Sequence, residues 1–115
     1  MRGDRERLQD ILEAIDKASR IIQRKEGPFI EDEMAQVWAA FHIQVIGEAA
    51  SRLSSELRDL HPDIPWTDVI AMRNIIVHHY FGIDPQQIWD TVVNDLVPLK
   101  RIIEDILGRL GDREQ

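Results

Sequence analysis

Eight consecutive residues in the second half of this 115-residue chain bring together side chains suited to phosphate binding and proton transfer. Arg73 and Asn74 are followed by three apolar residues and then by His78, His79 and Tyr80. An arginine can hold a phosphate through two parallel hydrogen bonds and keeps its charge at any physiological pH. A histidine can accept or donate a proton near neutrality. The segment therefore predicts phosphodiester chemistry that needs no metal ion.

Helix geometry limits how these groups can meet. Arg73 and His78 lie roughly 140° apart around an ideal helix, whereas Arg73 and Tyr80 fall within about 20° of each other. Either the helix ends near His78 and redirects the imidazole, or a second copy of the chain completes the site. Gly82 and the Asp84-Pro85 pair favour an end there. The alternative is that these residues have no catalytic role: both histidines would be ordinary surface or core residues, and Arg73 would be a solvated charge.

An ordered set of motifs resembles a known family. Arg73-x-x-x-x-His78-x-Tyr80 is similar to the Arg-x-x-x-x-His-x-Tyr signature of the HepT-like HEPN family, toxins paired with minimal nucleotidyltransferase antitoxins. Further stretches resemble family positions in the family's order, from about Met34 to Leu107. They are Ile46-Gly47-Glu48-Ala49, His61-Pro62-x-Ile64-Pro65-Trp66, Met72-Arg73-Asn74-Ile75, Tyr80-Phe81-Gly82 and Trp89.

The resemblance implies a metal-independent ribonuclease that needs no cofactor and has its site across a homodimer interface. His78 would act as general acid or base on the ribose hydroxyl or the leaving oxygen. Arg73 would bind the phosphate and offset charge in the transition state. Asn74 would orient one of these two groups, and His79 would support them.

The resemblance also implies regulation through Tyr80, to which a partner nucleotidyltransferase would attach AMP and so silence the toxin. The competing role of Tyr80 is packing against Phe81. The competing function for the whole chain is a non-catalytic helical module that binds a nucleotidyltransferase. The intact Arg73/His78 pair favours the enzyme, because a scaffold needs neither residue.

Composition restricts the class of protein. The length predicts one domain, residues 1–115, with a frayed C-terminus from about Asp112. We expect neither a membrane span nor an export leader, since no segment has the required apolar run. The absence of cysteine excludes disulfides and thiolate metal ligands and fits a cytoplasmic protein.

Charge is acidic overall and uneven along the chain. The net charge of −7 argues against broad electrostatic capture of nucleic acid, so an RNA substrate would need a local basic cleft. Residues 1–25 carry seven basic and five acidic side chains. Residues 26–66 carry only Arg52 and Arg58 against eight acids. That acidic stretch would suit a basic protein partner.

Apolar spacing predicts an all-helical, up-and-down bundle of four main helices. Asp84, Pro85 and Gln87 resemble a capping box, with proline at the first helical position. Pro98 should kink the last helix, because it removes one backbone hydrogen bond. The expected helices run from about Leu8 to Gly27, from about Glu31 to Leu53, from Pro65 or Thr67 through Arg73, and from Asp84 to Gly108 or Gly111.

The second helix should bury one apolar stripe and approach the Arg73 helix closely. Gly47 costs about 1 kcal/mol in a helix relative to alanine. With the small residues around it, Gly47 makes a low strip that a second helix can approach. Glu48 is either an exposed acid or a partner that holds Arg73 in place. The expected buried stripe is Met34, Val37, Trp38, Phe41, Val45 and Ile46.

The third helix should be apolar on two sides. Its core stripe is expected to be Val69, Met72, Ile76 and His79. Ile70 and Val77, on either side of Arg73, form a second stripe that predicts cover by a second copy of the chain.

The remaining histidines predict no metal site. His78 and His79 are adjacent and so diverge on a helix, and no His-x-x-x-His pair is present. We expect His42 to be a packing or surface residue and His61 to be a turn residue before Pro62.

Overall fold

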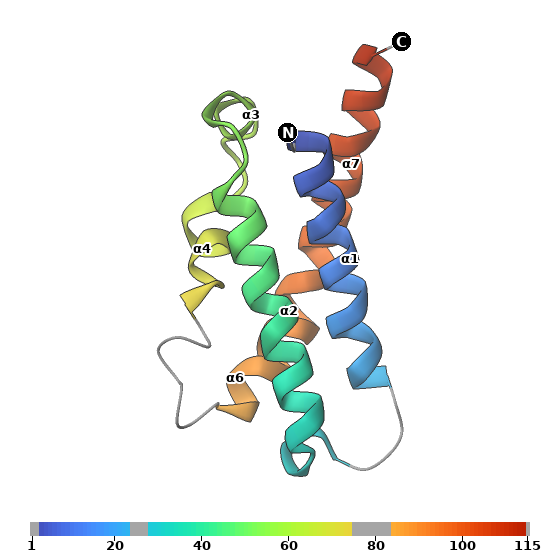
Figure 1. Ribbon diagram of the computed structural model, residues 1–115, viewed down its shortest axis with the longest axis vertical. Coiled ribbons are helices and arrows are strands. Elements are labelled where there is room, and N and C mark those ends of the chain that lie inside the picture. The colour runs from blue at the N-terminus through green and yellow to red at the C-terminus, as the bar shows by residue number, and fades with distance from the viewer. Residues whose placement is uncertain (1–2, 24–27, 75–83, 115) are drawn as a thin grey trace.

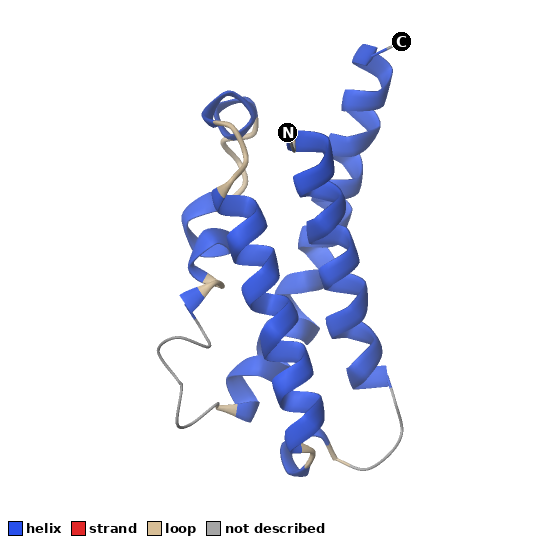
Figure 2. Cartoon of the chain, in the orientation of Figure 1, coloured by secondary structure: helices blue, strands red, loops and turns tan. Residues whose placement is uncertain are grey.

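The computed structural model describes residues 3–23, 28–74 and 84–114, and within these ranges all regular structure is helical (Figures 1 and 2). The predicted all-helical class is confirmed, whereas the count of four main helices is not, because several short helices intervene. The elements are α1 (Asp4–Gln23), the 3-10 helix η1 (Phe29–Glu31), α2 (Glu33–Ser51), α3 (Ser55–Leu60), α4 (Trp66–Ala71), α6 (Pro85–Asp90), the π-helical segment η2 (Thr91–Leu96) and α7 (Val97–Glu114).

The long helices α1 and α2 run antiparallel, and α7 packs against α1 (Figure 1). Their facing sides are fully buried, and each such aliphatic side chain contributes about 1.5–3 kcal/mol. The buried apolar residues form one cluster. None of the described helices is long and apolar enough to cross a membrane. The largest fully buried side chains are Leu8, Ile11, Ile15, Ile43, Ile46, Ile88, Leu96, Ile103 and Ile106.

Helices α3 and α6 each begin with a residue whose side chain accepts hydrogen bonds from the first backbone N–H groups of the helix. The Asp84 side chain accepts hydrogen bonds from the backbone N–H groups of Gln86 and Gln87, which confirms the predicted cap of α6. Ser54 caps α3 in the same way. The carboxylate of Asp4 accepts two hydrogen bonds from Ser54, 2.8 Å from its N–H and 2.6 Å from its hydroxyl. This contact joins the start of α1 to the start of α3.

The predicted buried stripe of α2 is wrong for most of its members. Met34 is 85% exposed, and Val37, Trp38 and Phe41 are about half exposed. These four residues are called the α2 apolar face below. The buried side of α2 consists instead of small residues, two isoleucines and His42, because alanine lets α1 approach closely. It comprises Ala35, Ala39, Ala40, His42, Ile43, Ile46, Gly47, Ala49 and Ala50.

The C-terminal helices follow one another without a gap from Pro85 to Glu114. Pro98 has no N–H with which to bond the carbonyl of Asn94, four residues earlier. The π-helical segment η2 ends at Leu96, two residues before Pro98. A π segment thus precedes Pro98 within a continuous helical run, and the kink at Pro98 stays a prediction. Gly108 does not end the helix, because α7 continues to Glu114.

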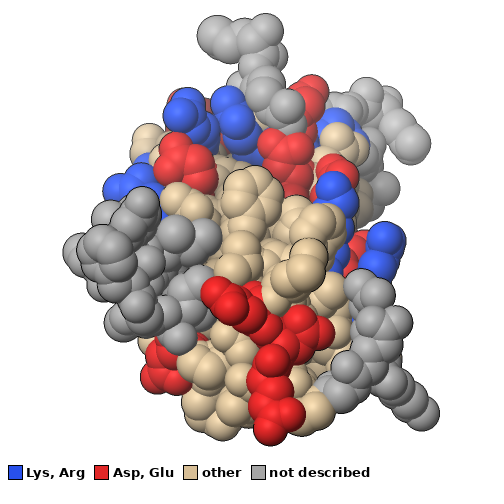
Figure 3. Space-filling view, turned by 60° about the horizontal axis from the view of Figure 1, so that its bottom comes forward, with Lys and Arg blue, Asp and Glu red and all other residues tan. Residues whose placement is uncertain are grey.

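Acidic side chains gather at the end of the molecule where α2 begins. Glu31 and Glu33 are exposed there, and Asp32 caps α2 through a 3.0 Å bond from the N–H of Ala35. Figure 3, which turns the lower end of Figure 1 toward the viewer, shows a group of acidic side chains beside uncharged surface. Part of the acidic charge that the sequence has between residues 28 and 66 therefore lies together on the surface.

Candidate functional site

Arg73 and Asn74 lie just beyond the C-terminal end of α4. The N–H of Arg73 donates to the carbonyl of Ile70 at 3.1 Å and that of Met72 to the carbonyl of Val69 at 3.2 Å, so the helical turn extends to Arg73. Both Arg73 and Asn74 are exposed. The other predicted site residues of this segment, His78, His79 and Tyr80, lie outside the described residues.

The backbone of Arg73 is held directly against α2 at Gly47. A β-carbon placed on Gly47 would lie 2.8 Å from the carbonyl oxygen of Ile70, 2.9 Å from the Cα of Arg73, and closer still to the nitrogen of Arg73. Only glycine allows two helices to meet this closely. The predicted close approach of the Arg73 helix at Gly47 is confirmed. The position of Arg73 is therefore set by a backbone contact.

The guanidinium of Arg73 makes no hydrogen bond or ion pair with residues in the described ranges. The predicted contact with Glu48 is not formed, because Glu48 Oε1 accepts a 3.1 Å hydrogen bond from Arg52 Nε. Arg52 lies four residues after Glu48, a spacing at which a side-chain pair forms readily on a helix. Arg73 consequently presents its charge to solvent, as a phosphate-binding arginine requires.

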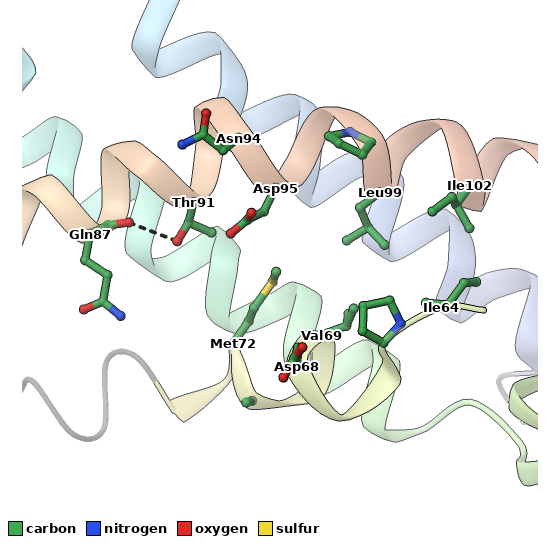
Figure 4. A pocket seen from close by; sticks show the side chains of 13 residues that line it. Ile64, Asp68, Val69, Met72, Gln87, Thr91, Asn94, Asp95, Leu99 and Ile102 are labelled. Carbon is green, nitrogen blue, oxygen red and sulfur yellow. Dashed lines mark hydrogen bonds between the residues drawn. The ribbon is translucent and has the colours of Figure 1, made fainter. Parts of the chain in front are cut away.

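A pocket of about 510 Å³ opens between α4 and the η2–α7 segment, beside the end of α4 (Figure 4). Met72, the residue before Arg73, lies in its wall. Periodicity within single helices gives no signal for this pocket, because its two walls are at least 15 residues apart in the chain. Its lining consists of Ile64, Pro65, Asp68, Val69, Ala71, Met72, Gln87, Thr91, Asn94, Asp95, Pro98, Leu99 and Ile102.

The histidines within the described ranges have structural positions. His42 is only 7% exposed, and its ring lies edge-on to the rings of Trp38 and Phe41. The distances between ring centroids are 4.6 Å to Trp38 and 5.1 Å to Phe41. Burial, and to a smaller degree the charge of Lys17, lowers the pKa of His42 below its ordinary value. The carbonyl of His61 accepts from the indole N–H of Trp66, as a turn residue can. No group of three or more potential metal ligands occurs in the described part of the chain.

Comparison with known proteins gives a consistent result. The family model described as "Ribonuclease HepT-like" matches residues 11–106. The chain is 33% identical over 108 residues to the "Probable ribonuclease HepT" of Thermococcus cleftensis, covering 91% of this chain and 96% of that protein. It is 31% identical over 98 residues to a Methanocaldococcus jannaschii protein named a putative RNase, covering 84% and 90%. No solved structure matches the chain at a comparable level.

Proposed function

Because the chain belongs to the HepT-like ribonuclease family, we propose that it is a cytoplasmic ribonuclease that cuts RNA without a metal ion, using Arg73 and His78. The observation that carries the proposal is the state of Arg73. Its backbone is fixed by contact with Gly47, while its guanidinium is exposed and makes no bond to the described residues. A fixed and available cation is what binding of a phosphodiester needs.

In the proposed reaction, a base removes the proton of the ribose 2′-hydroxyl and the oxygen attacks phosphorus. The bond to the 5′-oxygen breaks, and that oxygen takes a proton from an acid. His78 serves as one of these proton carriers, and Arg73 neutralises the charge that develops on the phosphate oxygens. Asn74 and His79 orient the reacting groups.

We propose that two copies of the chain form the active enzyme. The α2 apolar face supports this, because four large apolar side chains on one helix are left exposed. Exposed patches of this kind mark protein interfaces. Phe41 and Gly47 are six positions apart and thus lie about 120° apart around α2. A second copy on the α2 apolar face would therefore stand beside α4 and Arg73 and would bring two sets of site residues near one another.

The test is RNA cleavage by the purified chain in the presence of a chelator. Arg73→Ala and His78→Ala should each abolish cleavage while helicity and dimerisation are retained. Arg101→Ala is the matched control, because Arg101 is an exposed arginine of α7 that does not line the pocket. Full cleavage by the Arg73 or His78 variant would leave the non-catalytic interaction module as the better description. Loss of activity in chelator would contradict metal independence.

We further propose that the chain is the toxin of a toxin–antitoxin pair and that a partner nucleotidyltransferase silences it by attaching AMP to Tyr80. An adenylate on Tyr80 would bring negative charge to the segment that follows Arg73 and would compete with substrate phosphate. Mass spectrometry of the Tyr80 peptide after incubation with the partner and ATP tests this. Silencing without an adenylate on Tyr80 would mean that the partner inhibits by binding alone.

A further inference from the structure

The pocket beside α4 has apolar walls suited to a flat ligand. Val69 of α4 and Leu99 of α7 are buried side chains in its lining, and Pro65, directly before α4, and Pro98 of α7 also line it. Its volume of about 510 Å³ falls within the range of small-molecule pockets, about 300–1,000 Å³. Such walls would cover the two apolar faces of a planar ring system.

The charged groups of the pocket are two carboxylates, which only accept hydrogen bonds. In Figure 4, the carboxylate of Asp95 points from η2 into the gap between the helices, whereas Asn94 points away from it. Asp68 lies on the opposite wall, in α4. Neither carboxylate makes a hydrogen bond or ion pair within the described part of the chain. The Thr91 hydroxyl already donates to the carbonyl of Gln87 at 2.9 Å. A ligand that fits must therefore bring N–H donors at the edge of its ring.

The location of the pocket adds a second requirement. Met72 lines the pocket, and Arg73 is the next residue along the chain. For a ligand that has a planar ring in this pocket and carries a phosphate, Arg73 would be the cation that directly follows the pocket wall in the chain. A nucleotide has this combination of ring and phosphate, and proteins read unstacked RNA bases through their hydrogen-bonding edges.

We propose that this pocket binds the base of the nucleotide whose phosphate Arg73 holds, and that Asp95 selects guanine. The proposal rests on the proposed ribonuclease function and names the substrate preference of that site. Guanine presents two adjacent donors, its ring N–H and its amino group, which one carboxylate can accept together. Adenine and cytosine present an amino group alone, and uracil presents a single ring N–H that is flanked on both sides by carbonyl oxygens that a carboxylate repels. The order of preference is guanine, then adenine and cytosine, then uracil.

The experiment measures binding of 5′-GMP and 5′-UMP to the full chain by NMR titration, without any cleavage step. Both nucleotides carry the same phosphate, so a difference reports the base. GMP should bind about tenfold more tightly than UMP, the effect of one two-pronged base contact. Asp95→Asn should remove this preference. Asp63→Asn is the matched control, since it removes one charge from an exposed aspartate outside the pocket and should leave the preference unchanged.

Three results would overturn the proposal: equal binding of the two nucleotides, no binding of either at millimolar concentration, or a guanine preference that survives in Asp95→Asn. The outcome is separable from that of the proposed function. A chain that binds GMP through Asp95 yet cuts no RNA would refute the ribonuclease and keep the base site. A chain that cuts RNA equally at all four bases would keep the ribonuclease and refute the base site.

Discussion

Replacement of Gly47 by alanine tests how Arg73 is positioned. The added β-carbon would meet the backbone of α4 at 2.8 and 2.9 Å, whereas ordinary contacts begin at 3.4 Å. The end of α4 would have to retreat by roughly 0.5 Å or more, because packed backbone does not compress. The contact involves main-chain atoms of Ile70 and Arg73, so no side-chain rotation can relieve it.

The expected change in stability is the sum of two opposing effects. Alanine favours a helix over glycine by about 1 kcal/mol. Overpacking a close contact costs about 1–3 kcal/mol and can cost more. We expect the backbone clash to dominate and the free energy of unfolding to fall by about 1–2 kcal/mol. Gly108→Ala is the matched control, because a β-carbon on Gly108 of α7 has no neighbour within 4 Å. That variant should gain up to about 1 kcal/mol.

Urea unfolding of the two variants and of the parent chain measures these changes, and RNA cleavage measures their effect on the site. Displacement of a substrate-binding group by 1 Å can reduce a rate by about 100-fold. Gly47→Ala should therefore lose about tenfold or more of its activity in the folded state, whereas Gly108→Ala should keep full activity. A Gly47→Ala variant that is as stable and active as Gly108→Ala would refute the view that this contact positions Arg73.

Three further predictions concern other contacts. Asp4→Ala should lower the free energy of unfolding by about 1–2 kcal/mol, because it breaks both bonds to Ser54, and urea unfolding checks this. The pKa of His42 is lowered in the folded chain, so the unfolded chain binds more protons below about pH 6.5 and the free energy of unfolding decreases as the pH is lowered there. Unfolding measured at pH 7 and at pH 5 should show that His42→Gln loses less stability between the two pH values than the parent chain does. Phe41→Glu should yield a monomer in sedimentation experiments, whereas Leu60→Glu, at an equally exposed apolar residue outside the α2 apolar face, should not.

Local rules were sufficient for the features that depend on neighbouring residues in the chain. The cap at Asp84 follows from an aspartate before a proline, and the structure has it. The close contact at Gly47 follows from a glycine kept inside a helix despite its cost, which needs an explanation in packing. The turn at His61 follows from two prolines close together. Each of these depends on backbone conformations that a few adjacent side chains determine.

The tertiary structure decided which face of α2 is buried. This helix is apolar on two sides, with large side chains at Met34, Val37, Trp38 and Phe41 and with alanines on the other. Large apolar residues suggested the inner face, but α1 packs on the alanine face because two helix backbones can come closer there. The pocket with Asp95 was likewise set by packing, whereas the pairing of Glu48 with Arg52 is a local contact between residues four apart on one helix. Periodicity reports that a face is apolar, but the partner that covers it comes from a distant part of the chain or from another chain.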